Sequence, residues 1–433
     1  MQGYHAIRDL KKDSTFKKGD VLVLFGELFT RGYANGLVEE AERRGLKIIR
    51  TTVGRREKDG TLRALNNEEA ALVPKPFINI PLEAGFDLEP DNDGVTPVDQ
   101  LKEAKLSDWE TFPMNKTSLE VSRKKGRERF LKNTRAYLQE LEAHIPSGVN
   151  VIFAHLMAGG VPRTKIVMPL MNRSLRGSGD KFLSSEKFWN SPIGQFCEQN
   201  FYEVTAETFA TLIQESASLR EKIQKSGGKV SYTAYGYHGT EVLVGDQYLW
   251  QTYSPYVQGW AKVRLENHAR DFKQKGIACA VYNCPEILTN SSAIFNGVEV
   301  SLYPLLGALK KEGPHSSRAQ GAIKECLGML KPDNNLESIL AYTKDYLMSP
   351  VIREHCQFEK WPQHNSKPQL EKMLAASDHL LQLHKDPKQL MTFALSELVL
   401  EACGKVMMAD CAAPEAPVSW INHDVIAKIT AQS

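Results

Sequence analysis

The stretch Val21-Leu-Val-Leu-Phe25-Gly26-Glu-Leu-Phe-Thr-Arg-Gly32-Tyr-Ala-Asn-Gly36 joins a continuous apolar run to a glycine-rich loop. Such a run is typical of a strand that helices cover on both faces of a parallel sheet. The glycines let the backbone turn tightly and approach a pyrophosphate, whose charge is favoured by the N-terminus of the helix expected over 36–44. The stretch therefore predicts the first strand, phosphate loop and first helix of a nucleotide-binding α/β fold.

Apolar runs of strand length alternate with helical patterns along the rest of the chain. This alternation predicts an α/β fold with a Rossmann-like, doubly wound parallel sheet of about seven strands. The further strands are expected at 47–53, 77–80, 149–154, 229–235, 276–282 and 404–410.

The chain is expected to form a single unit over residues 1–433. Within it, residues 19–294 would form the cofactor-binding and catalytic core. Residues 295–395 read as almost wholly helical and would form a helical insertion that covers the substrate before the last strand. Residues 396–433 would supply the last helix, the last strand and the C-terminal tail.

Composition excludes several classes of protein. The 433 residues are 42% hydrophobic and can bury one or two substantial cores. A net charge of +2 is too balanced to indicate binding to nucleic acid or to an anionic membrane. Seven scattered cysteines with no CxxC pair indicate reduced thiols, and neither a disulfide framework nor a metal site. No apolar run approaches membrane-span length, so we expect a cytoplasmic protein without an integral membrane segment.

The phosphate loop departs from the common GxGxxG spacing, because five residues stand between its first two glycines. Glu27 lies where a carboxylate would repel a pyrophosphate, so we expect it to point away or to pair with Arg31. The alternative for the whole loop is a structural turn. The residues expected to contact the cofactor here are Gly26, Gly32, Tyr33 and Gly36.

The end of the second strand usually carries an acid that binds the ribose of NAD. Here the strand runs into Thr51-Thr-Val-Gly54-Arg55-Arg56-Glu57. Arg55 and Arg56 could bind a 2′-phosphate bidentately, which favours NADPH. Glu57 keeps NADH possible, and both arginines could also be plain loop residues.

The loop after the fourth strand, residues 153–164, is rich in small residues. Small side chains at the carboxyl edge of a strand let a cofactor lie flat against the backbone. Ala158 and Gly159 are therefore expected to contact the cofactor. His155 is either a polar contact to ribose or substrate, or a hydrogen-bonded structural histidine.

Tyr253 and Lys262 form a second informative pair, with eight residues between them. A nicotinamide reductase needs a phenol that donates or orients a proton at the oxygen that gains charge. It also needs an ammonium that holds the cofactor ribose and keeps the phenol acidic. Tyr256 is the alternative phenol, and Tyr235 and Tyr237 at the end of the fifth strand could also face the pocket.

The motifs Trp250-x-x-Tyr253 and Gly259-x-Ala261-Lys262, followed by Leu265, resemble the catalytic stretch of FabV-type trans-2-enoyl-ACP/CoA reductases. That family also has eight residues between its tyrosine and lysine. The segments 283–294, 301–304 and 309–313 resemble its threonine/serine segment and helix after the sixth strand. The resemblance runs in order over roughly 19–330, and the FabMG branch of enoyl-ACP reductases is similar to still more of the chain.

The resemblance implies a short-chain-dehydrogenase-like fold in which NAD(P)H reduces the 2,3 double bond of a trans-2-enoyl thioester in fatty-acid synthesis. The thioester would be carried on acyl carrier protein or CoA. By position, Tyr253 would stabilise the enolate or assist its protonation, and Lys262 would bind the ribose hydroxyls. Thr289 and Ser291 would lie near the nicotinamide amide or a phosphate. The oligomeric state stays open.

Two other functions remain open at this stage. A ketone or alcohol dehydrogenase of the same fold would have its tyrosine at position 258, where this chain has Gln258, although Ser231 could act as its serine. A catalytically inactive nucleotide-binding sensor is favoured by Glu27. Apolar side chains at helical spacing would either cover an acyl chain or form simple core: Phe295, Leu302, Tyr303, Leu305, Leu306, Leu309 and Met329.

Overall fold

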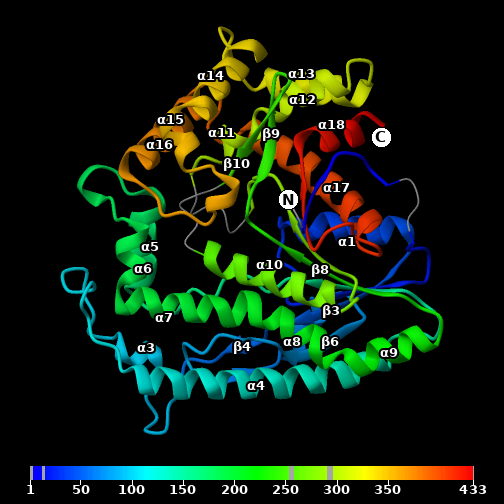
Figure 1. Cartoon of the computed structure of the whole chain (residues 1–433), viewed down its shortest axis with the longest axis vertical. Coiled ribbons are helices and arrows are strands. Elements are labelled where there is room, and N and C mark those ends of the chain that lie inside the picture. Colours follow the sequence, from blue (N-terminus) through cyan, green and yellow to red (C-terminus); the bar gives the residue numbers. More distant parts are fainter. Residues whose placement is uncertain (1–2, 12–14, 253–257, 290–295, 433) are drawn as a thin grey trace.

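The computed structural model describes residues 3–11, 15–252, 258–289 and 296–432. Within them, eight strands form one parallel sheet in the spatial order β1-β12-β11-β8-β7-β2-β3-β6 (Figure 1). Their bounds are β1 Tyr4–Ile7, β2 Val21–Phe25, β3 Lys47–Thr52, β6 Phe77–Pro81, β7 Val151–His155, β8 Val230–Tyr235, β11 Cys279–Asn283 and β12 Val418–Ile421. The strand order reverses between β2 and β7, as in a doubly wound sheet, and the predicted fold class is confirmed.

Helices cover both faces of this sheet (Figure 1). The helices of the described residues, including those that lie beyond the sheet, are α1 Tyr33–Arg44, α2 Asn67–Ala71, α3 Pro97–Gln100, α4 Lys116–Glu142, α5 Val167–Arg176, α6 Ser185–Asn190, α7 Pro192–Phe201, α8 Thr208–Glu215, α9 Ala217–Lys225, α10 Gly259–Gln274, α11 Val298–Leu302, α12 Leu305–Glu312, α13 Ser317–Gly328, α14 Leu336–Met348, α15 Pro350–Glu354, α16 Lys367–Gln382, α17 Met391–Asp410 and α18 His423–Gln432.

Two apolar cores lie on the two sides of the sheet. In β2, Leu22 and Leu24 join the core that α1 and α17 also build. Val21, Val23 and Phe25 join the opposite core, which α4, α8 and α10 complete. Because both faces are covered, every residue of β2 is buried, and this explains the continuous apolar run in the sequence.

The strand predicted at 404–410 is wrong. Those residues form the end of helix α17, and the last strand is β12, which pairs in parallel with β1 and β11. Helix α17 packs against α1, α11, α13 and α18, so apolar residues occur on almost all its sides. A helix without a polar face has no 3.6-residue period in its hydrophobic pattern. The last seven residues of α17 therefore have the same pattern as a buried strand.

Three small features also escaped the sequence patterns. Strand β1 extends the sheet beyond β12. Strands β9 Thr240–Val244 and β10 Gln247–Gln251 form an antiparallel hairpin between β8 and α10. Strands β4 Arg55–Arg56 and β5 Leu62–Arg63 form a second hairpin directly after β3. The first hairpin ends at Gln251, just before the segment of the sequence that carries Tyr253, and the second contains the two arginines for which phosphate binding was predicted.

Helices α11 to α17 lie between β11 and β12, where the helical insertion was predicted (Figure 1). Phe295 lies outside the described residues, and Met329 is partly buried at the edge of the core. Fully buried core positions are taken by Leu302, Tyr303, Leu305, Leu306 and Leu309. Their burial fits a role in the protein core, which was one of the two predicted roles, better than the covering of an acyl chain.

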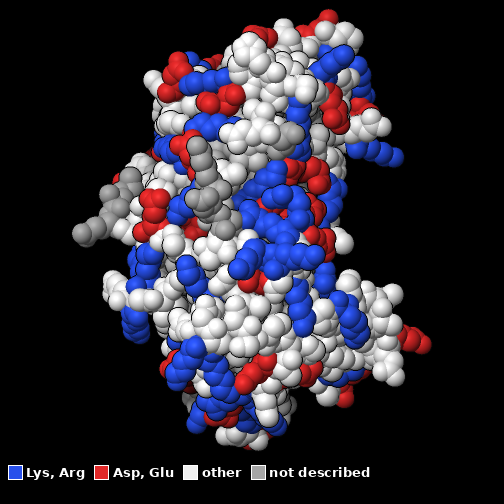
Figure 2. All heavy atoms as spheres, turned by 90° about the vertical axis from the view of Figure 1, so that its right-hand side faces the viewer, with Lys and Arg blue, Asp and Glu red and all other residues white. Residues whose placement is uncertain are grey.

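Charges of both signs share the surface. Figure 2 shows Lys and Arg side chains gathered near the middle of one face, with Asp and Glu side chains beside them. Ion pairs such as Lys11–Asp410, at 2.6 Å, join distant parts of the chain. Among the described residues, no helix is both long and apolar enough to cross a membrane.

Candidate active site

The glycine loop after β2 starts with a residue that must be glycine. Gly26 has a φ of +116°, and a Cβ there would lie 3.2 Å from the backbone of Leu156. The backbone of Leu156 in turn donates a 2.8 Å hydrogen bond to the carbonyl of Phe25. The loops after β2 and β7 therefore lie side by side at the carboxyl edge of the sheet, where open α/β sheets bind their ligands.

Gly32 precedes helix α1 and leaves its N-terminus open. The residue is extended, and no side chain in the described part of the chain caps the helix there. A Cβ on Gly32 would meet nothing closer than 3.9 Å, so neither packing nor backbone geometry demands a glycine. An uncapped helix N-terminus beside a residue without a side chain suits a phosphate group. These residues thus fit the pyrophosphate of a dinucleotide.

Gly36 and Tyr33 each contact another part of the chain. A Cβ on Gly36 would overlap the carbonyl of Leu400, and one on Gly404 would overlap Gly36, so these glycines permit the close packing of α1 on α17. Tyr33 donates a 2.7 Å hydrogen bond to the carbonyl of Pro285, after β11, and stacks on the ring of Tyr235. Tyr33 therefore bridges the ends of β8 and β11.

Glu27 does not pair with Arg31, so this one of its two expected arrangements is wrong. Arg31 contacts Glu397 at 3.6 Å. Glu27 accepts two hydrogen bonds from Arg55, at 2.8 and 2.9 Å, and one from the hydroxyl of Thr52 at 2.8 Å. The hairpin after β3 turns Arg55 back toward the loop and makes this pairing possible.

Arg56 is also held by carboxylates. Its guanidinium contacts Glu83 at 3.1 Å and Glu89 at 2.9 Å, and it donates to the carbonyl of Gly60 at 2.7 Å. Neither Arg55 nor Arg56 is therefore a plain loop residue. Each guanidinium already makes charge-assisted hydrogen bonds to a carboxylate, so a 2′-phosphate at either arginine would lie beside that negative charge.

The loop after β7 exposes Ala158 and holds Gly159 at a φ of +99° with open space around it. Behind it, a π-helical turn over Tyr202–Glu207 supports the loop, and Thr205 donates to the carbonyl of Gly159 at 3.3 Å. The backbone near Ala158 and Gly159 is thus accessible to a ligand, and its contact with a cofactor stays a prediction.

His155 is a structural histidine. Its Nε2 lies 2.8 Å from the hydroxyl of Thr208, and its ring packs between Phe25 and Phe209. Burial, together with the charge of Lys262, lowers the pKa of His155 to about 3. The imidazole therefore stays neutral at physiological pH.

Lys262 lies in the first turn of α10 and is only 4% exposed. Its ammonium donates a 2.6 Å hydrogen bond to the carbonyl of Tyr235, at the end of β8. Burial lowers the pKa of Lys262 to about 8, against the opposing effect of the Glu266 carboxylate one turn further along the helix. The structure thus places a buried, titratable ammonium at the carboxyl edge of the sheet.

Several other residues predicted for the site lie outside the described residues or apart from the carboxyl edge. Tyr253, Tyr256 and Ser291 belong to the undescribed segments. Thr289 is partly exposed in the loop after β11. Ser231, considered for a dehydrogenase, is buried near the start of β8 and away from the carboxyl edge.

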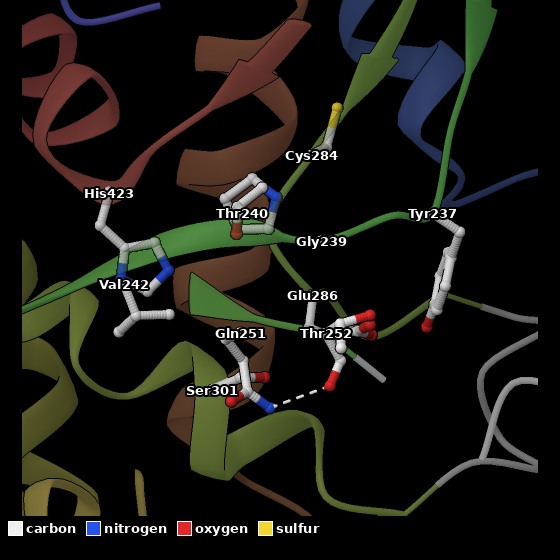
Figure 3. Close-up of a pocket in the computed structure, with 11 residues that line it drawn as sticks. Tyr237, Gly239, Thr240, Val242, Gln251, Thr252, Cys284, Glu286, Ser301 and His423 are labelled. Atoms are coloured by element: carbon white, nitrogen blue, oxygen red, sulfur yellow. Dashed lines mark hydrogen bonds between the residues drawn. The ribbon is translucent and has the colours of Figure 1, made fainter. Parts of the chain in front are cut away.

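Glu286 is a residue that sequence reasoning missed. It lines a narrow pocket beside the ends of β8 and β11, together with Tyr237, Thr252 and His423 (Figure 3). Burial raises the pKa of Glu286 to about 7, while a hydrogen bond with Tyr237 acts in the opposite direction. The only sequence signal was its place directly after the sixth predicted strand, where ligand-binding residues gather.

Comparisons with known proteins agree with this geometry. The family model "Enoyl-acyl carrier protein reductase FabMG" matches residues 3–430. An apo structure of FabMG, described as a novel type of enoyl-acyl carrier protein reductase, is 45% identical, with a TM-score of 0.95 over 100% of this chain and 99% of that one. An NADH-bound structure of FabMG is 39% identical, with a TM-score of 0.79 over 99% and 98%. No curated protein sequence matches. The chain belongs to the FabMG family of enoyl-acyl carrier protein reductases, oxidoreductases that reduce the double bond of an enoyl thioester in fatty-acid synthesis.

Proposed function

We propose that this enzyme uses NADH to reduce trans-2-enoyl groups on acyl carrier protein, with Lys262 and Tyr253 as its catalytic pair. The observation that carries the proposal is the buried Lys262 ammonium at the carboxyl edge of β8. The choice of NADH is supported by the NADH-bound FabMG relative and by the carboxylate partners of Arg55 and Arg56. This replaces the leaning toward NADPH that the two arginines suggested from sequence.

Each residue of the site would have a separate role in the reaction. Bound NADH would supply the hydride that reaches the β-carbon of the substrate. Lys262 would hold the ribose hydroxyls and favour, through its charge, the ionised form of a nearby phenol. Tyr253 would hydrogen-bond the thioester oxygen as it gains enolate charge, before the α-carbon takes up a proton. Gly26, Gly32 and the open end of α1 would bind the pyrophosphate.

The test is an absorbance assay of reduced cofactor with three substrates. Purified enzyme is mixed with NADH or NADPH and with 2-decenoyl-ACP, 2-decenoyl-CoA or a simple ketone. We expect fastest oxidation with NADH and the ACP substrate. Turnover of the ketone alone would instead support a dehydrogenase. Tight NADH binding without turnover of any substrate would support an inactive sensor.

A further inference from the structure

The carboxylate of Glu27 occupies an unusual place. It belongs to the loop after β2, but its side chain lies at the end of the neighbouring strand β3. There it accepts hydrogen bonds from the Thr52 hydroxyl at 2.8 Å and from the Val53 backbone N–H at 3.3 Å. Arg55 holds it from the other side through two nitrogens. These contacts fix one carboxylate between the phosphate loop and the end of β3.

That position is where a doubly wound sheet meets the adenosine ribose of a dinucleotide. The acid that binds the ribose usually stands at the end of the second strand, next to the glycine loop. Here β3 ends at Thr52, and Val53 and Gly54 follow it, so none of these residues is acidic. The structure brings an acid to this place from the loop, 25 residues away from Thr52 in sequence.

The carboxylate keeps free capacity for a ligand. Its Oε2 atom accepts from Thr52, Val53 and Arg55, whereas Oε1 accepts one bond from the described residues, that from Arg55. A carboxylate oxygen has two lone pairs, so Oε1 can accept a further hydroxyl. The side chain is 18% exposed, which leaves it accessible from the carboxyl edge.

Glu27 is ionised at neutral pH. Burial alone would raise its pKa, but the hydrogen bonds from Arg55, Thr52 and Val53 and the charge of Arg55 hold the pKa below its ordinary value. An ionised carboxylate attracts ribose hydroxyls as hydrogen-bond donors and repels a phosphate.

We propose that Glu27 binds the 2′-hydroxyl of the adenosine ribose and that Arg55 orients it, so that this pair selects NADH against NADPH. The assignment rests on the proposed use of a nicotinamide dinucleotide. In this assignment Glu27 replaces the ribose-binding acid that usually stands at the end of the second strand. Its carboxylate then has a role beside the dinucleotide, although it would repel the pyrophosphate. Arg55 serves as a positioning residue, since its guanidinium binds both oxygens of the Glu27 carboxylate, whose negative charge disfavours a 2′-phosphate beside it.

The experiment compares Glu27→Gln with wild type by direct binding and by kinetics. Affinities of the enzyme for NAD⁺, NADP⁺, NADH and NADPH are measured by calorimetry without substrate, and kcat and KM are measured with 2-decenoyl-ACP. We expect Glu27→Gln to lower the affinity for NADH and for NAD⁺ by about tenfold or more, because a hydrogen bond to a charged group is lost. Affinity for NADPH should rise, because Arg55 is released, and kcat with saturating NADH should change little.

Two further variants separate recognition from folding. In Glu27→Gln with Arg55→Ala, the gain in NADPH affinity should disappear. Glu215→Gln removes another partly exposed carboxylate that pairs with an arginine, Arg135, and should leave the ratio of NADH to NADPH affinity unchanged. Thermal melting checks that each variant is folded.

The inference is overturned if Glu27→Gln melts lower than wild type but keeps the same ratio of NADH to NADPH affinity. That result would make the Glu27–Arg55 pair a structural clamp. Failure of the proposed function looks different, because wild type would then bind no dinucleotide or would oxidise neither cofactor with any enoyl substrate.

Discussion

Lys262 donates a 2.6 Å hydrogen bond from its buried ammonium to the backbone carbonyl of Tyr235. The bond ties the first turn of α10 to the end of β8, where the ring of Tyr235 stacks on Tyr33 at the start of α1. One lysine thus joins the reactive helix to the strand edge that faces the open end of α1. The position of the ammonium is set by the fold before any ligand binds.

Lys262 predicts an alkaline limit to activity. Burial lowers its pKa to about 8, so the side chain is a charged ammonium below that pH and a neutral amine above it. Values of kcat/KM should therefore fall as pH rises above about 8. Lys262→Ala should lower kcat/KM by about 100-fold or more at pH 7. The measurement is a pH profile of NADH oxidation for wild type and Lys262→Arg, whose charge persists and whose limit should move to higher pH.

The contribution of Lys262 to stability changes with pH in the opposite direction to activity. This difference distinguishes a loss of catalysis from unfolding. A lysine with a folded pKa of about 8 and an ordinary value of 10.5 binds its proton more weakly in the folded chain. Between these values the unfolded chain holds more protons, so the contribution of Lys262 to the free energy of unfolding rises with pH. Loss of activity that coincides with melting would contradict the assignment.

Glu266 is expected to tune the ammonium without touching substrate. Its buried carboxylate raises the pKa of Lys262, against the larger effect of burial. Glu266→Gln should therefore move the alkaline limit of kcat/KM to lower pH. The carboxylate also contacts His238 and Arg270, each at 3.3 Å, so His238→Gln serves as a control for lost packing. An unchanged limit in a folded Glu266→Gln enzyme would exclude this role.

Glu286 predicts a stability that falls as pH rises. Burial raises its pKa to about 7, from an ordinary value of 4.5, so the folded chain holds this proton more tightly. The contribution of Glu286 is complete below about pH 4.5 and is lost as pH rises through 7. Glu286→Gln should gain about 1–3 kcal/mol relative to wild type between pH 4.5 and 8, in urea denaturation curves. Glu186→Gln, at an exposed carboxyl, is the control, and the same gain in both variants would contradict the argument.

The central strands could be predicted because burial on both faces leaves a simple signal. Val21–Phe25 is apolar at every position, since its side chains enter both cores. The end of α17 has the same signal for another reason, since helices surround it, and local pattern alone does not separate the two cases. The Glu27–Arg55 pair depends on a hairpin after β3, which is a tertiary feature. Sequence position alone suggested Arg31 as the partner.

Close packing of α1 on α17 predicts two sensitive glycines. A Cβ on Gly36 would overlap the Leu400 carbonyl, and a Cβ on Gly404 would overlap the backbone of Gly36. Gly36→Ala and Gly404→Ala should each lower the free energy of unfolding by about 1–3 kcal/mol, as overpacking does. Gly321→Ala in α13, where a Cβ meets nothing within 4 Å, is the matched control. Chemical denaturation of the three variants decides the point, and equal midpoints would show that the helices can separate without cost.

The last prediction concerns Tyr253 and Tyr256, because substitution by Phe removes the hydroxyl of each side chain and keeps its ring. If Tyr253 stabilises the enolate, Tyr253→Phe should lower kcat by about 10²–10⁴, the usual range for a proton-handling group. Direct binding of NADH should hardly change, because the hydroxyl acts on the substrate. Tyr256→Phe, three residues further on, removes the same atom type and should keep most of the activity. The reverse result would assign the role to Tyr256, and two fully active variants would show that the enolate is stabilised by another group.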